Sequence, residues 1–144
     1  MRDEKREPKE YLGQIYKIDN YIKFLEGEIL ELTTMAEGGA INYDERVQTS
    51  GRASTESIMC SIVDRKSLVY DMLNKKLRLK DEISSKIYEL YDKDNTQVYQ
   101  AILFARYVAC LRWDEISNKL GYSIRRVHDL HGRALKSFGE KVDY

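Results

Sequence analysis

The sequence has few of the residues that sheets, disulfide frameworks and metal sites need. It contains one proline, eight glycines and two cysteines among 144 residues. So few turn-forming residues favour helices over a sheet of many strands. Cys60 and Cys110 lie far apart, with no CxxC pair or neighbouring ligand cluster. We therefore expect two buried, reduced thiols and no metal or redox site.

Long apolar runs are missing as well. No run approaches the roughly 18 residues that a membrane helix needs, and the charged start MRDEKREPKE lacks the apolar segment of a signal peptide. These absences predict a soluble, cytoplasmic protein. The sequence also has no glycine-rich phosphate loop, nucleophile elbow or paired-carboxylate motif. We therefore expect neither enzymatic activity nor a cofactor.

The formal net charge is zero, which argues against a protein coated in basic residues. The charge is unevenly distributed, however. From Lys93 onward there are nine Lys/Arg and six Asp/Glu, a balance of +3, and subtraction from 24 and 24 leaves 15 against 18, or −3, in residues 1–92. The two halves therefore carry opposite charge, and the second half is the basic one.

The spacing of apolar residues in the first half predicts two long helices. After Pro8, apolar residues recur at alternating intervals of four and three up to the pair Gly38-Gly39, which is a heptad seam with isoleucine at every a position. A less regular stripe follows from about Thr55 to Tyr91. We expect an antiparallel, coiled-coil-like hairpin over residues 1–92; a symmetric dimer seam is the alternative, and both can coexist. The two stripes are Tyr11, Ile15, Ile18, Ile22, Leu25, Ile29 and Leu32, and Ile58, Ile62, Val69, Leu73, Ile83, Ile87 and Leu90.

A long connector, EGGAINYDERVQTSGRAST within residues 37–56, joins the two predicted helices. Loops of this length are usually functional or disordered. We expect a mobile polar loop; the alternative is that Ser50, Gly51 and Arg52 order against the hairpin or bind a phosphate.

The cluster DKDNTQ separates the hairpin from a domain at residues 93–144. Three helices are predicted there, at about 95–110, 113–120 and 123–138, the first capped by Asp94, Asn95 or Thr96. The last two have the register of a helix-turn-helix, with a small residue and a glycine at the turn and a serine cap after it. The inward residues of this register are Ile116, Ser117, Leu120 and Gly121, then Val127, Leu130, Ala134 and Phe138 after the Ser123 cap.

That register turns a basic face outward. Arginines in the first exposed turn of the second helix stand where a helix-turn-helix enters the major groove; a solvated face with ordinary charges is the alternative. We expect Trp113 to anchor the core and Gly132 to mark close backbone packing or a fraying point. His128 and His131 lack a third ligand, so no metal is expected. The outward residues are Arg125, His128, Asp129, Gly132, Arg133 and Lys136, with Arg126 on the flank.

The segment ILFARYVACLRWDEISNKLGYSIRRVHDLHGRAL resembles region 4 of bacterial sigma factors. The whole chain more closely resembles the small sigma-region-4-like regulators of phages and prophages, the ArpU/RinA-type group. This resemblance implies a DNA-binding transcriptional regulator that activates phage genes, late ones among them, at promoter DNA together with host RNA polymerase. The matching positions are Leu103, Arg106, Tyr107, Glu115, Ile116, Leu120, Gly121, Ser123, Val127, Ala134 and Leu135.

The resemblance also implies roles for single residues. It puts Ile124, Arg125, His128 and Asp129 at the bases, and other cations at the DNA backbone. Arg112 stands where sigma factors usually have a capping Thr or Ser, and Ile124 replaces a polar residue, so the recognised sequence should differ from a housekeeping −35 element. The full set expected at the DNA is Arg106, Ser123, Ile124, Arg125, Arg126, His128, Asp129, Arg133 and Lys136.

Two other functions remain open from the sequence. One is an adaptor that docks on RNA polymerase without reading DNA, which would not need the pair Arg125 and Arg126. The other is a phage small terminase subunit, which also joins a helix-turn-helix to long helices. The chain is too short to add the promoter-melting region of a sigma factor, so we expect it to act with polymerase or as a homodimer.

Overall fold

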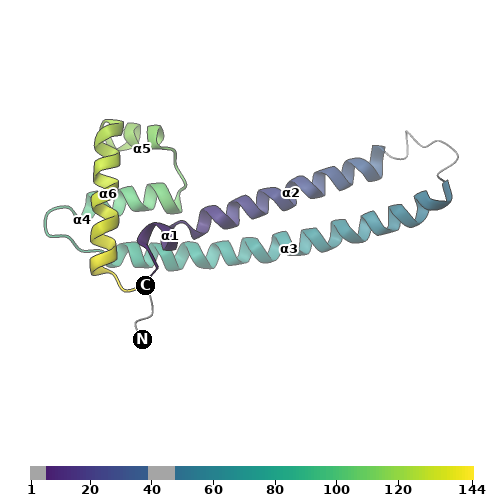
Figure 1. Ribbon diagram of the computed structural model, residues 1–144, viewed down its shortest axis with the longest axis horizontal. Coiled ribbons are helices and arrows are strands. Elements are labelled where there is room, and N and C mark those ends of the chain that lie inside the picture. The colour runs from purple at the N-terminus through teal and green to yellow at the C-terminus, as the bar shows by residue number, and fades with distance from the viewer. Residues whose placement is uncertain (1–5, 39–47) are drawn as a thin grey trace. The chain divides into compact units, whose positions relative to one another are not determined.

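The computed structural model describes residues 6–38 and 48–144, with the side chains described at 6–37 and 55–144. All regular structure in these residues is helical, so the predicted all-α class is confirmed. None of these helices has the length and the low polarity that crossing a membrane requires. The elements are α1 (Pro8–Leu12), α2 (Gln14–Gly38), α3 (Gln48–Glu89), α4 (Thr96–Leu103), the π-helix η2 (Phe104–Val108), α5 (Trp113–Leu120) and α6 (Ile124–Lys141) (Figure 1).

The chain divides into two compact units. The first combines Met1–Lys17 with Lys76–Tyr144, and the second is Ile18–Lys75. The domain boundary expected between residues 92 and 93 does not coincide with this division. The reason is that α1 and the end of α3 contribute buried residues to the same core as α4 and α6.

A single hydrophobic core holds the first unit together. α1, the first turn of α2 and the last turns of α3 contribute isoleucine, leucine and tyrosine side chains that pack with those of α4, η2 and α6. Removing these side chains from water is the main favourable term for this unit. The core residues are Tyr11, Leu12, Ile15, Ile83, Ile87, Leu90, Tyr99, Ile102, Leu103, Tyr107, Val108, Leu130, Ala134, Phe138 and Val142.

The first predicted helix is interrupted at Gly13. The heptad spacing continues through this position, so the sequence predicts one helix, but the structure separates α1 from α2 here. The Gly13 N–H donates to the carbonyl oxygen of Lys9 at 3.0 Å, and a Cβ at Gly13 would lie 2.9 Å from that oxygen. Only glycine fits this close approach of backbone to backbone.

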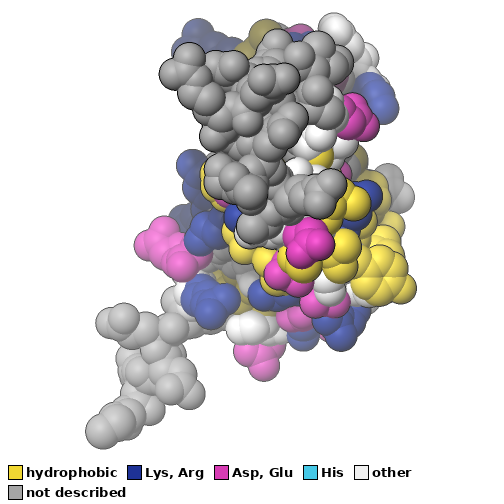
Figure 2. Space-filling model, turned by 90° about the vertical axis from the view of Figure 1, so that its right-hand side faces the viewer, with side chains coloured by type: hydrophobic (Ala, Val, Ile, Leu, Met, Phe, Trp, Pro, Cys, Tyr) yellow, Lys and Arg dark blue, Asp and Glu magenta, His cyan; other side chains and the backbone are white. Residues whose placement is uncertain are grey.

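In the second unit, α2 and α3 lie side by side, and residues of their two heptad stripes are buried there. Ile18, Ile22 and Leu25 of α2 and Ile62 of α3 are buried, and an ion pair of 2.6 Å joins Glu28 to Arg65. These buried positions confirm that part of the predicted stripes. Other apolar residues of this unit are exposed, and hydrophobic side chains are visible at the surface in Figure 2.

Three sequence expectations about the middle of the chain are wrong. Leu73 was expected in the inward stripe of α3 but is 42% exposed. Cys60 was expected to be buried and is exposed, while Cys110 is half-buried. α3 begins at Gln48 and not near Thr55. Residues 39–47 of the expected connector lie outside the described residues, and although Ser50, Gly51 and Arg52 belong to α3, their side chains are not described.

The turn between α5 and α6 is built from local hydrogen bonds. Gly121 has φ 73°, and its N–H donates to the Ser117 carbonyl at 3.0 Å. The Ser117 hydroxyl donates to the carbonyl oxygen of Tyr122. The Ser123 hydroxyl oxygen accepts the N–H of Arg126 at 3.1 Å, so Ser123 caps α6 as expected. These bonds satisfy backbone groups that would otherwise be left without partners at the two helix ends.

The start of α5 has an unusual cap. Arg112 occupies the N-cap position, where its guanidinium cannot accept a hydrogen bond. The carboxylate of Glu115 instead accepts the Arg112 N–H at 2.9 Å, which is one half of a capping box. Ahead of α4, Asn95 holds the N-cap position without a side-chain cap bond, and the Thr96 hydroxyl bonds the backbone of Asp92.

Close backbone packing was expected at Gly132, but the structure shows it at Gly139, another glycine of α6. A Cβ at Gly132 would meet no heavy atom within 4 Å, so this position faces open space. A Cβ at Gly139 would lie 2.8 Å from the ring of Pro8. α1 and α6 therefore approach each other closely at Gly139.

Replacing Gly121 by alanine should destabilise the first unit by about 1 kcal/mol, because alanine is strained at positive φ. Gly132→Ala, the same change inside α6, should stabilise the unit by up to about 1 kcal/mol through helix propensity. Urea unfolding followed by the fluorescence of Trp113, the only tryptophan, measures both. Changes of the same sign in the two variants would contradict the assigned backbone geometry.

Candidate nucleic-acid interface

The inward stripe of α6 decides which of its side chains reach solvent. Val127, Ala134 and Phe138 are fully buried and Leu130 is 3% exposed, as the sequence predicted. A helix buried along these positions presents its other side to water. The exposure expected for the α6 residues is therefore confirmed, whereas their contact with DNA stays a prediction. The exposed residues are Ile124, Arg125, Arg126, His128, Asp129, Gly132, Arg133 and Lys136, with Ser123 exposed at the cap.

Charges on the exposed face of α6 are partly paired. Asp129 Oδ2 lies 3.0 Å from Arg126 Nη1 and 3.5 Å from Arg133 Nε. Arg125 forms no ion pair or hydrogen bond with any residue that the structure describes. Its guanidinium stands in the first turn of α6, where no acidic residue lies. The five donor groups of this side chain are therefore available to a partner.

Two cations in the first turn of α6 are unfavourable for the isolated protein. The helix dipole places partial positive charge at this end, so Arg125 and Arg126 each lose roughly 0.3–1 kcal/mol relative to a neutral residue there. An anion bound at the same end would offset this effect, because the helix dipole and the two cationic residues of the first turn both favour negative charge there. The arrangement therefore fits an anionic ligand better than water alone.

Arg106 of η2 packs against two aromatic rings. Its guanidinium sits 4.2 Å from the centre of the Trp113 ring and 5.5 Å from that of Tyr16, and its Nη1 donates to the Leu111 carbonyl at 3.0 Å. The Tyr16 hydroxyl donates to the Arg106 carbonyl at 2.6 Å. These contacts hold the start of α2 against η2. The structure thus gives Arg106 a packing role, and its expected contact with the DNA backbone stays a prediction.

Trp113 links the packing of η2 to that of α6. It is half-buried, and its ring centre lies 4.3 Å from that of His128 and 4.7 Å from that of His131. Trp113 is not among the core residues, so it packs between Arg106 of η2 and the two histidines of α6 and does not anchor the core as expected. Stacking on one side of the exposed His128 ring limits the orientations that this side chain can take.

His131 and Tyr107 form a buried polar pair that the sequence analysis missed. Tyr107 Oη and His131 Nε2 are 2.7 Å apart in the core. Burial, with smaller contributions from Lys9, Arg106 and His128, lowers the pKa of His131 to about 4. Burial raises the pKa of Tyr107 to about 12. Both side chains are therefore neutral near pH 7. Within the described residues no cluster of His, Cys, Asp and Glu could hold a metal ion.

A groove of about 250 Å³ runs beside the second half of α6. It brings Arg133 and Lys136, both expected at the DNA, together with Lys141, which the sequence analysis did not single out. Lys141 Nζ lies 3.1 Å from Asp92 Oδ2, and this hydrogen bond lowers the pKa of Asp92. The groove therefore combines three cations with two carboxylates, Asp92 and Glu140, and its lining has a net charge of +1. Its lining residues are Asp92, Tyr99, Arg133, Lys136, Ser137, Glu140 and Lys141.

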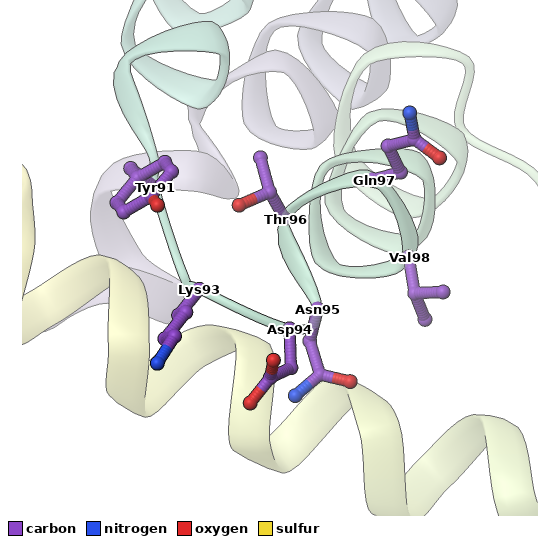
Figure 3. A pocket seen from close by; sticks show the side chains of 7 residues that line it. All are labelled: Tyr91, Lys93, Asp94, Asn95, Thr96, Gln97 and Val98. Carbon is purple, nitrogen blue, oxygen red and sulfur yellow. The ribbon is translucent and has the colours of Figure 1, made fainter.

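A second pocket, of about 400 Å³, lies at the loop between α3 and α4. Figure 3 shows Lys93, Asp94 and Asn95 projecting from this loop. One lysine and one aspartate balance each other in charge, and no residue expected at the DNA lines the pocket. It offers no clear preference for an ionic ligand. The lining residues are Tyr91, Lys93, Asp94, Asn95, Thr96, Gln97 and Val98.

Comparison with known proteins adds nothing to this geometry. Neither the family models, nor the curated proteins, nor the solved structures compared with this chain match it. The function is therefore inferred from the residues of α5 and α6 and from their arrangement.

Acid should selectively weaken the core around His131. Its folded-state pKa of about 4 lies below its ordinary value of 6.5, so the unfolded chain takes up the proton first as the pH falls. The stabilisation is complete above about pH 6.5 and is lost towards pH 4, by up to about 3 kcal/mol. His131→Gln should remove this part of the pH dependence of urea unfolding.

Tyr107→Phe is the control for this measurement. It deletes the hydrogen bond but leaves a buried histidine, so the steeper loss of stability between pH 6.5 and 4 should persist. Identical pH dependence in the wild type and in His131→Gln would contradict the buried neutral histidine.

Proposed function

We propose that the protein is a DNA-binding transcriptional regulator in which α5, the turn at Gly121 and α6 form a helix-turn-helix similar to sigma region 4. The observation that carries the proposal is the position of Arg125. This cation is exposed in the first turn of α6 and has no partner among the described residues, while the buried stripe of the helix faces the core. In a helix-turn-helix, this turn of the second helix enters the major groove.

The side chains of α6 divide into two roles. Arg125 can pair with O6 and N7 of guanine, and the exposed Ile124 beside it can contact a thymine methyl group. Arg126, Arg133 and Lys136 are suited to phosphates, which position the protein without reading sequence. The groove that also contains Lys141 continues this cationic surface along α6.

The long helices complete the proposed architecture. α2 and α3 form an antiparallel hairpin that is joined to the helix-turn-helix unit through the end of α3. By the resemblance of the chain to phage regulators, the natural ligand is promoter DNA of phage genes, and host RNA polymerase is the protein partner. Docking on polymerase without DNA and the role of a small terminase subunit are outcomes of the experiments below.

A second copy of the chain is the other partner we propose. The seam of α2 is covered by α3 in the same chain, so it is not the surface left for a dimer. On α3, four apolar side chains that are 42–67% exposed share one heptad face, which the exposed Lys66 interrupts. A second copy presents the same face with the same spacing, which permits coiled-coil packing. These residues are Met59, Val63, Tyr70 and Leu73.

Arg125→Ala should abolish sequence preference, with a loss of about 1–3 kcal/mol on the preferred duplex if the guanine contact is bidentate. The preferred sequence comes from selection out of random duplex DNA. Competitive titration then compares that duplex with a scrambled one at several salt concentrations.

Arg133→Ala is the matched arginine variant. It should weaken both duplexes about equally and lower the salt slope by about one, since its partner is a phosphate. If neither variant changes binding to either duplex, α6 does not read DNA, and docking on polymerase becomes the better hypothesis.

The full chain should sediment as a dimer at micromolar concentration, and Tyr70→Lys should shift it towards monomer by placing a charge within the apolar face. Leu30→Lys, an equally exposed site on α2, should leave the dimer intact. Sedimentation as monomer alone at roughly ten times that concentration would contradict the dimer, and a larger ring would favour the terminase function.

A further inference from the structure

One carboxylate oxygen holds two of the cations on the exposed face of α6. Asp129 Oδ2 contacts Arg126 Nη1 at 3.0 Å, one turn before it, and Arg133 Nε at 3.5 Å, one turn after it. Asp129 therefore offsets one of the two positive charges on the arginines that the proposed function assigns to phosphates. Arg125, which that function assigns to a base, is left out of this arrangement.

A carboxylate can stand in for a phosphate oxygen. Both are anionic acceptors of guanidinium N–H groups. The three side chains are 46–60% exposed, so water screens their ion pairs and each pair is weak. A DNA phosphate can therefore displace Asp129, but the displaced carboxylate then remains close to the DNA backbone without its partners.

We propose that Asp129 is a positioning residue that competes with DNA phosphates for Arg126 and Arg133. This inference rests on the proposed DNA-binding function. In the free protein Asp129 holds both guanidinium groups along the helix, and on binding it must release them. The sequence-independent part of the affinity is lowered as a result, while Arg125 remains ready to contact a base. The protein would thus bind less tightly to DNA of arbitrary sequence than its count of cations suggests.

The test uses the full chain and a labelled duplex of random sequence, titrated by fluorescence anisotropy at several salt concentrations. Asp129→Asn keeps the shape and removes the charge. It should bind roughly threefold to fivefold more tightly at low salt, which corresponds to two weak ion pairs, and its salt slope should be steeper by about one. Asp143→Asn removes the same charge just beyond α6 and should have a smaller effect on both quantities.

A second pair of variants separates competition from simple repulsion. When Arg126 and Arg133 are both changed to glutamine, the further change Asp129→Asn should no longer tighten binding. If the gain persists without the two arginines, Asp129 acts directly on the DNA charge and the inference is wrong. The same conclusion follows if Asp129→Asn binds no more tightly than the wild type.

Failure of the proposed function has a different signature. If the wild-type chain binds neither the random duplex nor the selected one, DNA binding itself is refuted, and this inference falls with it. If the wild type binds with a normal salt dependence but the charge of Asp129 has no effect, only the inference is refuted. Circular dichroism of each variant verifies that the helices are retained.

Discussion

Burial of one apolar stripe on α6 is the interaction on which the rest of the first unit depends. Leu130, Ala134 and Phe138 pack into the core that α1, α3 and α4 share. Because side chains around a helix have fixed angular positions, this burial also determines where every charged residue of α6 points. The position of Arg125 and the pairing of Arg126 with Asp129 are consequences of core packing.

The turn between α5 and α6 determines which way the buried stripe of α6 faces. Gly121 adopts a left-handed conformation, and Ser123 caps the new helix within two residues, so the chain reverses without exposing unsatisfied backbone groups. Trp113 then packs against both His128 and His131. This contact holds the start of α5 against the middle of α6. It thereby limits the movement of the exposed face of α6.

The electrostatics of α6 reflect two opposing demands. Cations near the positive end of the helix dipole and near one another are unfavourable in isolation. Asp129 reduces that repulsion by pairing with two of them, and Lys141 is similarly paired with Asp92. The net positive charge of the C-terminal half is therefore partly masked in the free protein, whereas Arg125 has no such partner among the described residues.

The sequence by itself determined the features that depend on local chemistry. Helical class follows from spacing, the cap at Ser123 and the turn at Gly121 follow from residue type, and the exposed face of α6 follows from its inward stripe. Only the tertiary structure decided the break at Gly13, the packing of Arg106 between two aromatic rings and the buried bond between Tyr107 and His131. Each of these depends on atoms that only folding brings close together, and the pattern of residue types does not predict such an approach. Periodicity indicates which side of a helix is buried, but the close packing of the whole core determines which element covers that side.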